Sequence, residues 1–262
     1  MSLLKAIPAT GIVRAQIPGG PELRLFADGD PVATALFWGG LAAYEYVTIQ
    51  LFLKLVKHSQ VVFDIGANTG LFALLAAMGD PQRRVVAFEP SPEVFPKLKA
   101  NIELNHAHNC LIEKSAVTDR EGSITFYMRP GALLEGSTLK GFREGAQGVS
   151  VEAVTLDSYV LRRRIPKVDL LKIDTEATEP SVLEGASCTL RRDAPVIICE
   201  VLYGRTEKEL HRLLDGTGYE YFWITDRGLI RKDRIEGDPT YKFQNYLFVH
   251  ESKQEQIENF GF

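Results

Sequence analysis

The chain has 262 residues, of which 45% are hydrophobic and 24% are charged, and its formal net charge is −4. These values predict one large domain, or one domain with appendages, and leave no basic surplus for holding a nucleic-acid backbone. The three cysteines are odd in number and widely spaced, which predicts reduced, buried thiols in a cytoplasmic protein and not a disulfide framework.

The first 40 residues predict a small N-terminal appendage. Residues 11–17 and 23–26 have the composition of two short strands around a Pro-Gly-Gly-Pro turn. We expect the main domain to cover residues 41–250 and a short tail to follow at 251–262.

A helix is predicted at residues 41–57, where apolar residues recur at helical spacing. Glu45, Gln50 and Lys54 make it too polar to span a membrane. Glu45 has two interpretations. It is either an acid on the exposed side of the helix or a polar contact at the mouth of a ligand site, because the helix leads directly into the first core strand.

The stretch 61–72 predicts the centre of the fold: a buried parallel strand, a glycine-rich turn and a helix start. Its turn has the spacing Asp64-x-Gly66-x-x-x-Gly70. Glycines let a ligand approach the backbone closely, and the helix start adds unpaired N–H groups. The dinucleotide fingerprint G-x-G-x-x-G is absent, which argues against a nicotinamide dehydrogenase.

Acids follow several of the predicted strands. Glu89 ends the strand 85–88, where an acid can accept hydrogen bonds from ribose hydroxyls. The strand 168–173 is followed by Asp174 and Glu176. Because the carboxyl ends of parallel strands meet at one edge, these acids should lie near Asp64, and together they favour a polar, cationic ligand.

The remaining segments carry weaker signals. A third strand is predicted at 110–117, and alternating apolar residues at 124–128 predict an edge strand. The glycine-rich stretch 129–148 predicts a mobile loop over the site, with Ser137 and Thr138 as contact points. Near the C-terminus, strands at 219–224 and 246–249 flank a basic loop and predict a closing hairpin.

Together these stretches resemble the FkbM family of methyltransferases, over roughly residues 41–250. The matching motifs are Tyr44-Glu45, Asp64-Ile-Gly-Ala-Asn-Thr-Gly70, Ala87-Phe-Glu-Pro90, Thr155-Leu-Asp157, Leu170-Leu-Lys-Ile-Asp174-x-Glu176, Ile197-x-x-Glu200 and Asn245-Tyr-Leu-Phe248. The resemblance implies an α/β fold with a Rossmann-like, seven-stranded, mostly parallel sheet, helices on both faces and an antiparallel last strand.

The resemblance also implies methyl transfer from S-adenosylmethionine to a hydroxyl of a small-molecule acceptor, such as a sugar or a secondary metabolite. No nucleic acid is expected as a partner, and a homodimer is a possible assembly. The residues expected to bind the cofactor are Glu45, Asp64, Gly66, Ala67, Asn68, Gly70, Glu89, Pro90, Ser115, Ala116 and Asp174.

Asp174 and Glu176 are the candidate catalytic acids, because a hydroxyl acceptor needs a base unless it is already acidic. In the alternative, Asp174 binds the cofactor and Glu176 holds the following loop. We predict no metal site, although Asp174, Glu176 and Glu200 could together bind Mg²⁺ through oxygen.

One position departs from the family pattern. The family usually reads Asp-Val-Glu-Gly-Ala-Glu where this chain reads Asp174-Thr-Glu-Ala-Thr-Glu179, so Ala177 replaces a glycine. If that position needs a positive φ, alanine strains the loop. This keeps open an alternative function, a non-catalytic module that binds the cofactor or a partner protein.

Overall fold

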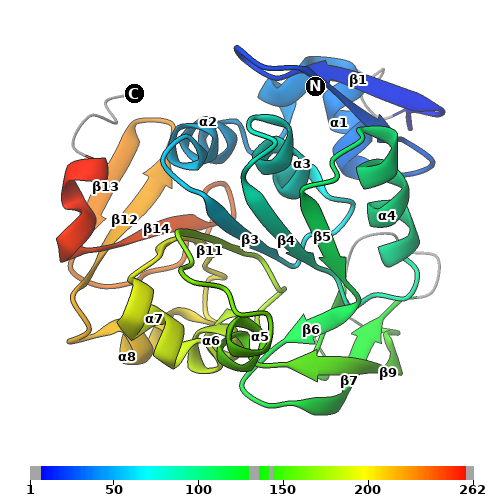
Figure 1. Ribbon diagram of the computed structural model, residues 1–262. Coiled ribbons are helices and arrows are strands. Elements are labelled where there is room, and N and C mark those ends of the chain that lie inside the picture. The colour runs from blue at the N-terminus through cyan, green and yellow to red at the C-terminus, as the bar shows by residue number, and fades with distance from the viewer. Residues whose placement is uncertain (1–6, 130–135, 142–143, 258–262) are drawn as a thin grey trace.

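The computed structural model describes residues 7–129, 136–141 and 144–257. Its centre is a sheet with the strand order β13-β12-β14-β11-β10-β3-β4-β5 (Figure 1). These strands are β3 (Val61–Ile65), β4 (Arg84–Phe88), β5 (Cys110–Glu113), β10 (Leu170–Ile173), β11 (Val196–Glu200), β12 (Tyr219–Thr225), β13 (Gly228–Lys232) and β14 (Asn245–His250).

The sheet is mostly parallel, as predicted. The strands β5, β4, β3, β10 and β11 run in one direction, and β14 lies antiparallel between β11 and β12. The predicted number of seven strands is wrong, because β13 adds an eighth. It forms in the segment predicted as a basic loop, where the two residues Asp226 and Arg227 turn the chain back so that Gly228 pairs with Thr225.

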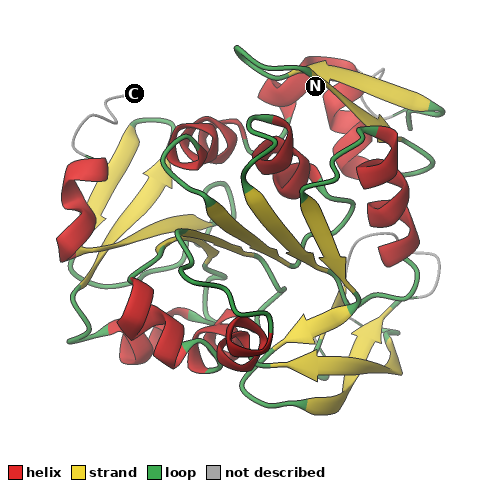
Figure 2. Ribbon diagram, in the orientation of Figure 1, coloured by secondary structure: helices red, strands yellow, loops and turns green. Residues whose placement is uncertain are grey.

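Helices cover both faces of this sheet (Figures 1 and 2). In the view of Figure 1, α2, α3 and α4 lie above the sheet, and α5 to α8 lie below it. The helices are α1 (Pro31–Gly39), α2 (Tyr46–Val56), α3 (Leu71–Met78), α4 (Phe95–Leu104), α5 (Leu156–Arg162), α6 (Glu179–Glu184), α7 (Ser187–Asp193) and α8 (Glu207–Leu214), with 3₁₀ turns η2 (Gly40–Ala43) and η3 (Glu251–Gln256).

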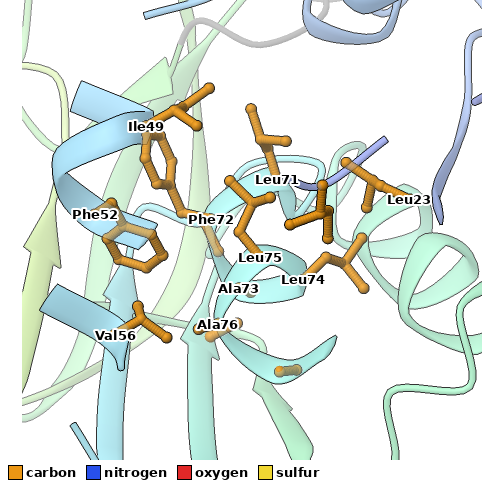
Figure 3. Close-up of a cluster of buried hydrophobic side chains, with 14 of the residues drawn as sticks. Leu23, Ile49, Phe52, Val56, Leu71, Phe72, Ala73, Leu74, Leu75 and Ala76 are labelled. Atoms are coloured by element: carbon orange, nitrogen blue, oxygen red, sulfur yellow. The ribbon is translucent and has the colours of Figure 1, made fainter. Parts of the chain in front are cut away.

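The core has two main layers because successive strand residues point to opposite faces. Val62 belongs to the cluster shared with α2 and α3, whereas Phe63 belongs to the cluster shared with α5 and α6. Figure 3 shows the first cluster, in which Phe52 and Phe72 meet edge to face at 5.1 Å between ring centroids. This packing fixes α2 and α3 beside the sheet edge where the site lies.

A second sheet, with the order β6-β9-β7-β8, lies beside the carboxyl end of β5 (Figure 2). Its strands are β6 (Ser115–Val117), β7 (Gly122–Met128), β8 (Gly136–Ser137) and β9 (Gln147–Val154). The single predicted strand 110–117 is therefore wrong: it breaks at Lys114 into β5 and β6, which belong to different sheets. The predicted edge strand β7 instead lies between β9 and β8, with Phe126 and Met128 in a small apolar cluster.

The predicted helix 41–57 is also interrupted. It consists of η2 and α2, and between them Glu45 adopts a left-handed conformation with φ of 34°. The break turns the Glu45 side chain away from the position that it would have on a continuous helix, and it lies on a cavity wall described below.

The N-terminal strands form a hairpin, β1 (Ile12–Gln16) with β2 (Glu22–Phe26). The hairpin rests on α4, where the amide oxygen of Asn101 accepts a hydrogen bond from the backbone N–H of Phe26 at 2.9 Å. Leu23 and Leu25 join the same apolar cluster as α3. The segment packs against the main core, and the domain boundaries remain a prediction.

Two smaller expectations can be compared with the structure. Cys110 and Cys199 are buried, but Cys188 is exposed, so its predicted burial is wrong. Cys188 lies in the first turn of α7, on the side that faces solvent. None of the described helices is long and apolar enough to cross a membrane.

Candidate functional site

A cavity of about 480 Å³ lies beyond the carboxyl ends of β3, β4, β10 and β11. In the sheet, the chain runs from β3 outward through β4 to β5 and then returns to the other side of β3 as β10. Ligands of open α/β sheets bind at such a reversal of strand order. The residues predicted for the site that line the cavity are Glu45, Asp64, Gly66, Ala67, Asn68, Glu89, Pro90, Ser115, Ala116, Asp174 and Glu176.

The turn after β3 needs its glycines. Gly66 has φ of 82°, and a Cβ on it would lie 1.8 Å from the carbonyl oxygen of Asp174. The loops after β3 and β10 therefore touch only because position 66 lacks a side chain. Gly70 caps α3 with φ of 97° and packs against Leu98, so its role is in the turn and it does not line the cavity.

Glu89 holds this turn from the neighbouring strand. Its two carboxylate oxygens accept hydrogen bonds from the backbone N–H groups of Asn68 and Ser91, each at 2.9 Å. Burial raises the pKa of Glu89 to about 7, against the effect of these hydrogen bonds. Each oxygen can accept a further hydrogen bond, so the carboxylate can serve a ligand as well as the turn.

Lys172 is the functional residue that the sequence analysis missed. It is 1% exposed, and its Nζ donates to Oδ2 of Asp174 at 2.9 Å. Burial opposes its charge, but the carboxylates of Asp174 and Glu45 outweigh that effect and raise the pKa of Lys172 above its ordinary value. The sequence did contain a signal for this residue, a single lysine inside the apolar strand Leu170–Ile173. Such a lysine must have an acidic partner, because an unpaired buried ammonium is energetically costly.

Asp64 lies beside Lys172 on the adjacent strand. It is 2% exposed, and among the described residues its Oδ2 atom has no hydrogen-bond partner. Burial raises the pKa of Asp64 to about 7, while Lys172 acts in the opposite direction. A buried carboxylate oxygen without a partner at a cavity wall is suited to a ligand that brings a donor or a positive charge.

Glu45 belongs to the cavity wall and not to an exposed helix face, so the second of its two interpretations is the one that fits. Its Oε2 accepts a hydrogen bond from Nδ2 of Asn245 at 3.0 Å. Burial raises the pKa of Glu45, and Lys172 opposes that shift. This contact joins the start of α2 to the start of β14, two segments 200 residues apart.

The loop after β10 has the strain that its sequence suggests. Glu176 and Ala177 both adopt left-handed conformations, with φ of 57° and 75°. Glu179 stabilises this loop, since its fully buried carboxylate accepts from the backbone N–H and the hydroxyl of Thr175 at 2.8 and 3.0 Å. Glu179 therefore helps to hold this loop, and the two alternative roles of Glu176 remain predictions.

The predicted mobile loop 129–148 is structured where the structure describes it. Ser137 lies in β8, is buried, and donates a hydrogen bond to the carbonyl oxygen of Glu176 at 2.6 Å. Thr138 lines the cavity and Ser137 lies behind it. Residues 130–135 and 142–143 lie outside the described residues, so mobility of the whole segment remains a prediction.

Two further motif residues have local structural contacts. The Asp157 carboxylate accepts hydrogen bonds from the backbone N–H groups of Cys188 and Thr189 at the start of α7. Glu200, at the end of β11, receives a hydrogen bond from Nε2 of Gln244 at 3.3 Å, and burial raises its pKa well above the ordinary value. Over the described residues, no three His, Cys, Asp or Glu side chains are grouped as a metal site would require.

The chain is similar in sequence to known methyltransferases. The family described as the methyltransferase FkbM domain matches residues 64–221. The hexuronic acid methyltransferase AglP of Haloferax volcanii is 28% identical over 171 residues, which cover 65% of this chain and 67% of that protein. The 31-O-demethyl-FK506 methyltransferase FkbM of Streptomyces tacrolimicus is 31% identical over 158 residues, or 50% of this chain and 60% of that protein.

Solved structures support the fold. A methyltransferase FkbM from Methylobacillus flagellatus aligns with a TM-score of 0.50 at 15% identity, covering 73% of this chain and 44% of that chain. A SAM-dependent methyltransferase from Agrobacterium tumefaciens aligns with a TM-score of 0.51 at 11% identity, covering 94% and 72%. From the family match over most of its central domain, the chain belongs to the FkbM methyltransferase family.

Proposed function

We propose that this protein transfers a methyl group from S-adenosylmethionine to a hydroxyl of a small molecule. The observation that carries the proposal is the cluster of Asp64, Glu89 and Asp174 around one cavity, with the single buried cation Lys172 among its described lining residues. Of these acids, Asp64 and Glu89 are buried, and burying carboxyl groups is costly unless a ligand brings positive charge or hydrogen-bond donors.

S-adenosylmethionine fits these residues chemically. Its ammonium and sulfonium groups carry positive charge, and its ribose hydroxyls can donate hydrogen bonds. The partnerless oxygens of Asp64 and Asn68 are orphaned polar atoms at the cavity, and such atoms call for a ligand partner. Glu89 is assigned to the ribose, and Asp174 with Glu45 to the ammonium end.

When bound, the cofactor supplies a methyl group whose bond to sulfur breaks as the acceptor oxygen bonds to it, leaving S-adenosylhomocysteine. The protein must hold the acceptor oxygen in line, about 3–3.5 Å from that carbon. It must also take the hydroxyl proton. We assign this role to Glu176, which lines the cavity close to Asp174.

A non-catalytic module is the second candidate function, and the replacement of a family glycine by Ala177 is the feature that raises it. The left-handed conformation at Ala177 costs roughly 1–2 kcal/mol for a residue with a Cβ. The loop nevertheless adopts this conformation, held by Glu179 and Ser137. Alanine at the position usually occupied by glycine therefore does not prevent the loop from forming. Because the loop keeps its conformation, we retain catalysis as the first candidate.

A labelled-methyl transfer screen tests the proposal. Purified protein, cofactor with a labelled methyl group and acceptors from neutral sugars, polyketide-like alcohols and lipids are combined, and label in each acceptor is counted. Transfer to a hydroxyl compound is expected. Tight cofactor binding with no transfer to any acceptor would instead support the non-catalytic module.

A further inference from the structure

A second cavity, of about 390 Å³, adjoins the first. It lies between the start of α2, the turn between β12 and β13, and the start of β14. The two cavities share three wall residues, Glu45, Glu200 and Gln244. A molecule in the second cavity would therefore lie directly against the groups that border the first.

The wall of the second cavity contains two polar atoms without a partner among the described residues. Among the described residues, Oε2 of Glu200 and Oδ1 of Asn245 are buried without a hydrogen bond, and the Asn245 side chain is only 7% exposed. Their other polar atoms are engaged, Asn245 with Glu45 and Glu200 with Gln244. Both orphaned atoms are acceptors, so they match a ligand that offers hydroxyl groups.

Among the described residues that line the two cavities, no unpaired cation is available to a carboxylate on a ligand. The two lysines among the described lining residues are already paired: Lys172 with Asp174, and Lys242 with Asp226 at 2.9 Å. Burial raises the pKa of Glu45 and of Glu200, so these walls already disfavour negative charge. The described acids that line one or both cavities are Glu45, Asp64, Glu89, Glu93, Asp174, Glu176, Glu200 and Asp226.

We propose that the methyl acceptor binds in the second cavity and that its walls, which offer no unpaired cation among the described lining residues, select an uncharged hydroxyl compound over its carboxylated counterpart. Tyr46 and Phe243 add ring surface for the body of the acceptor, and Glu200 with Asn245 receives its hydroxyls. The inference rests on the proposed function and adds to it the acceptor's place and charge class. It also separates this protein from a relative that is named for hexuronic acid.

The test uses a neutral sugar and its acid. Methyl glucopyranoside and methyl glucopyranosiduronic acid are each added to protein saturated with S-adenosylhomocysteine, and binding is read by saturation-transfer NMR. The neutral glycoside should bind, and the uronate should bind about fivefold more weakly or worse because its carboxylate would lose water without gaining a cationic partner.

Substitutions at the β12–β13 turn locate the binding. Asp226 lines the second cavity and its neighbour Arg227 does not, although both are exposed. Asp226→Trp should abolish the glycoside signal, and the matched control Arg227→Trp should keep it. Asp226→Asn, which frees Lys242 without filling the cavity, should strengthen binding of the uronate.

The outcomes separate the two proposals. Calorimetry with S-adenosylhomocysteine should give the same affinity for wild type, Asp226→Trp and Arg227→Trp, which also shows that the variants are folded. No such binding by the wild type would overturn the proposed function itself. With cofactor binding intact, an absent glycoside signal, equal binding of glycoside and uronate, or an undiminished signal in Asp226→Trp would each overturn the acceptor assignment alone.

Discussion

The two cavities differ in the part of the chain that builds them. The first is formed mainly by strand ends within residues 64–221, the range matched by the family. The second is formed by residues 45–48 and 224–245, and Glu200 is its one described lining residue inside that range. Glu45, Glu200 and Asn245 in the second cavity also belong to motifs that resemble the family, so we expect adaptation to a particular acceptor at its other lining residues, such as Tyr46, Asp226 and Phe243.

The largest expected effect is a loss of stability when the buried cation of the first cavity is removed. In Lys172→Met, Asp174 and Asp64 lose the charge that compensates them, so the free energy of unfolding should fall by about 3–5 kcal/mol. The surface pair Lys167–Asp169 provides the control, and Lys167→Met should cost less than about 1 kcal/mol. Equal losses in a urea titration would show that Lys172 has no special role.

The next largest effect concerns the base. Glu176→Gln should retain cofactor affinity and lower kcat by roughly 10²–10⁴-fold, the usual range for loss of a general base. The exposed Glu184 on α6 serves as a control, since Glu184→Gln should leave turnover unchanged. Wild-type turnover in Glu176→Gln, measured in single-turnover experiments, would rule out Glu176 as the base. The base would then be Asp174, or the acceptor would need none.

The acid cluster should also make stability depend on pH. Burial raises the pKa of Glu89 to about 7, above its ordinary value of 4.5, so the folded cofactor-free protein binds a proton that the unfolded chain releases. Stability from this group is present below that ordinary value and is lost as pH rises toward 7, by about 1–3 kcal/mol. Unfolding followed from pH 4.5 to 8 should show a smaller decline in Glu89→Gln, and an identical decline would contradict the assignment.

The smallest expected effect is a gain. Ala177→Gly should raise the free energy of unfolding by about 0.5–1 kcal/mol, because glycine accepts φ of 75° without strain. Ala42→Gly, at an exposed position in η2 without a positive φ, should lower it by a similar amount. If both variants lose stability in thermal unfolding, the loop conformation at Ala177 carries no strain.

Sequence patterns predicted the parts of the first cavity that depend on local signals. Apolar runs located β3, β4, β10 and β11, and the acids after them met at one edge because parallel strands end together. The missed features depend on contacts between distant segments. Lys172 is tolerated because Glu45 and Asp64, from other segments, join Asp174 around it. Ser137 was predicted as a contact point over the site, but its contact with the loop after β10 depends on β8 bringing it there.

The second cavity was harder to foresee for the same reason. Its wall depends on Asn245 meeting Glu45, which requires β14 to lie between β11 and β12. It also depends on the hairpin of β12 and β13, whose turn occurs in a segment that reads as a basic loop. Neither pairing has a local signature in the residues that form it.

The central claim is that one cavity holds the cofactor and the other does not, and calorimetry with S-adenosylmethionine tests it most directly. Glu89→Ala should weaken binding by about 1–3 kcal/mol, the cost of leaving polar partners unpaired. Asp226→Trp should bind the cofactor with wild-type affinity. Unchanged affinity in a folded Glu89→Ala protein, or weakened affinity in a folded Asp226→Trp protein, would contradict this division.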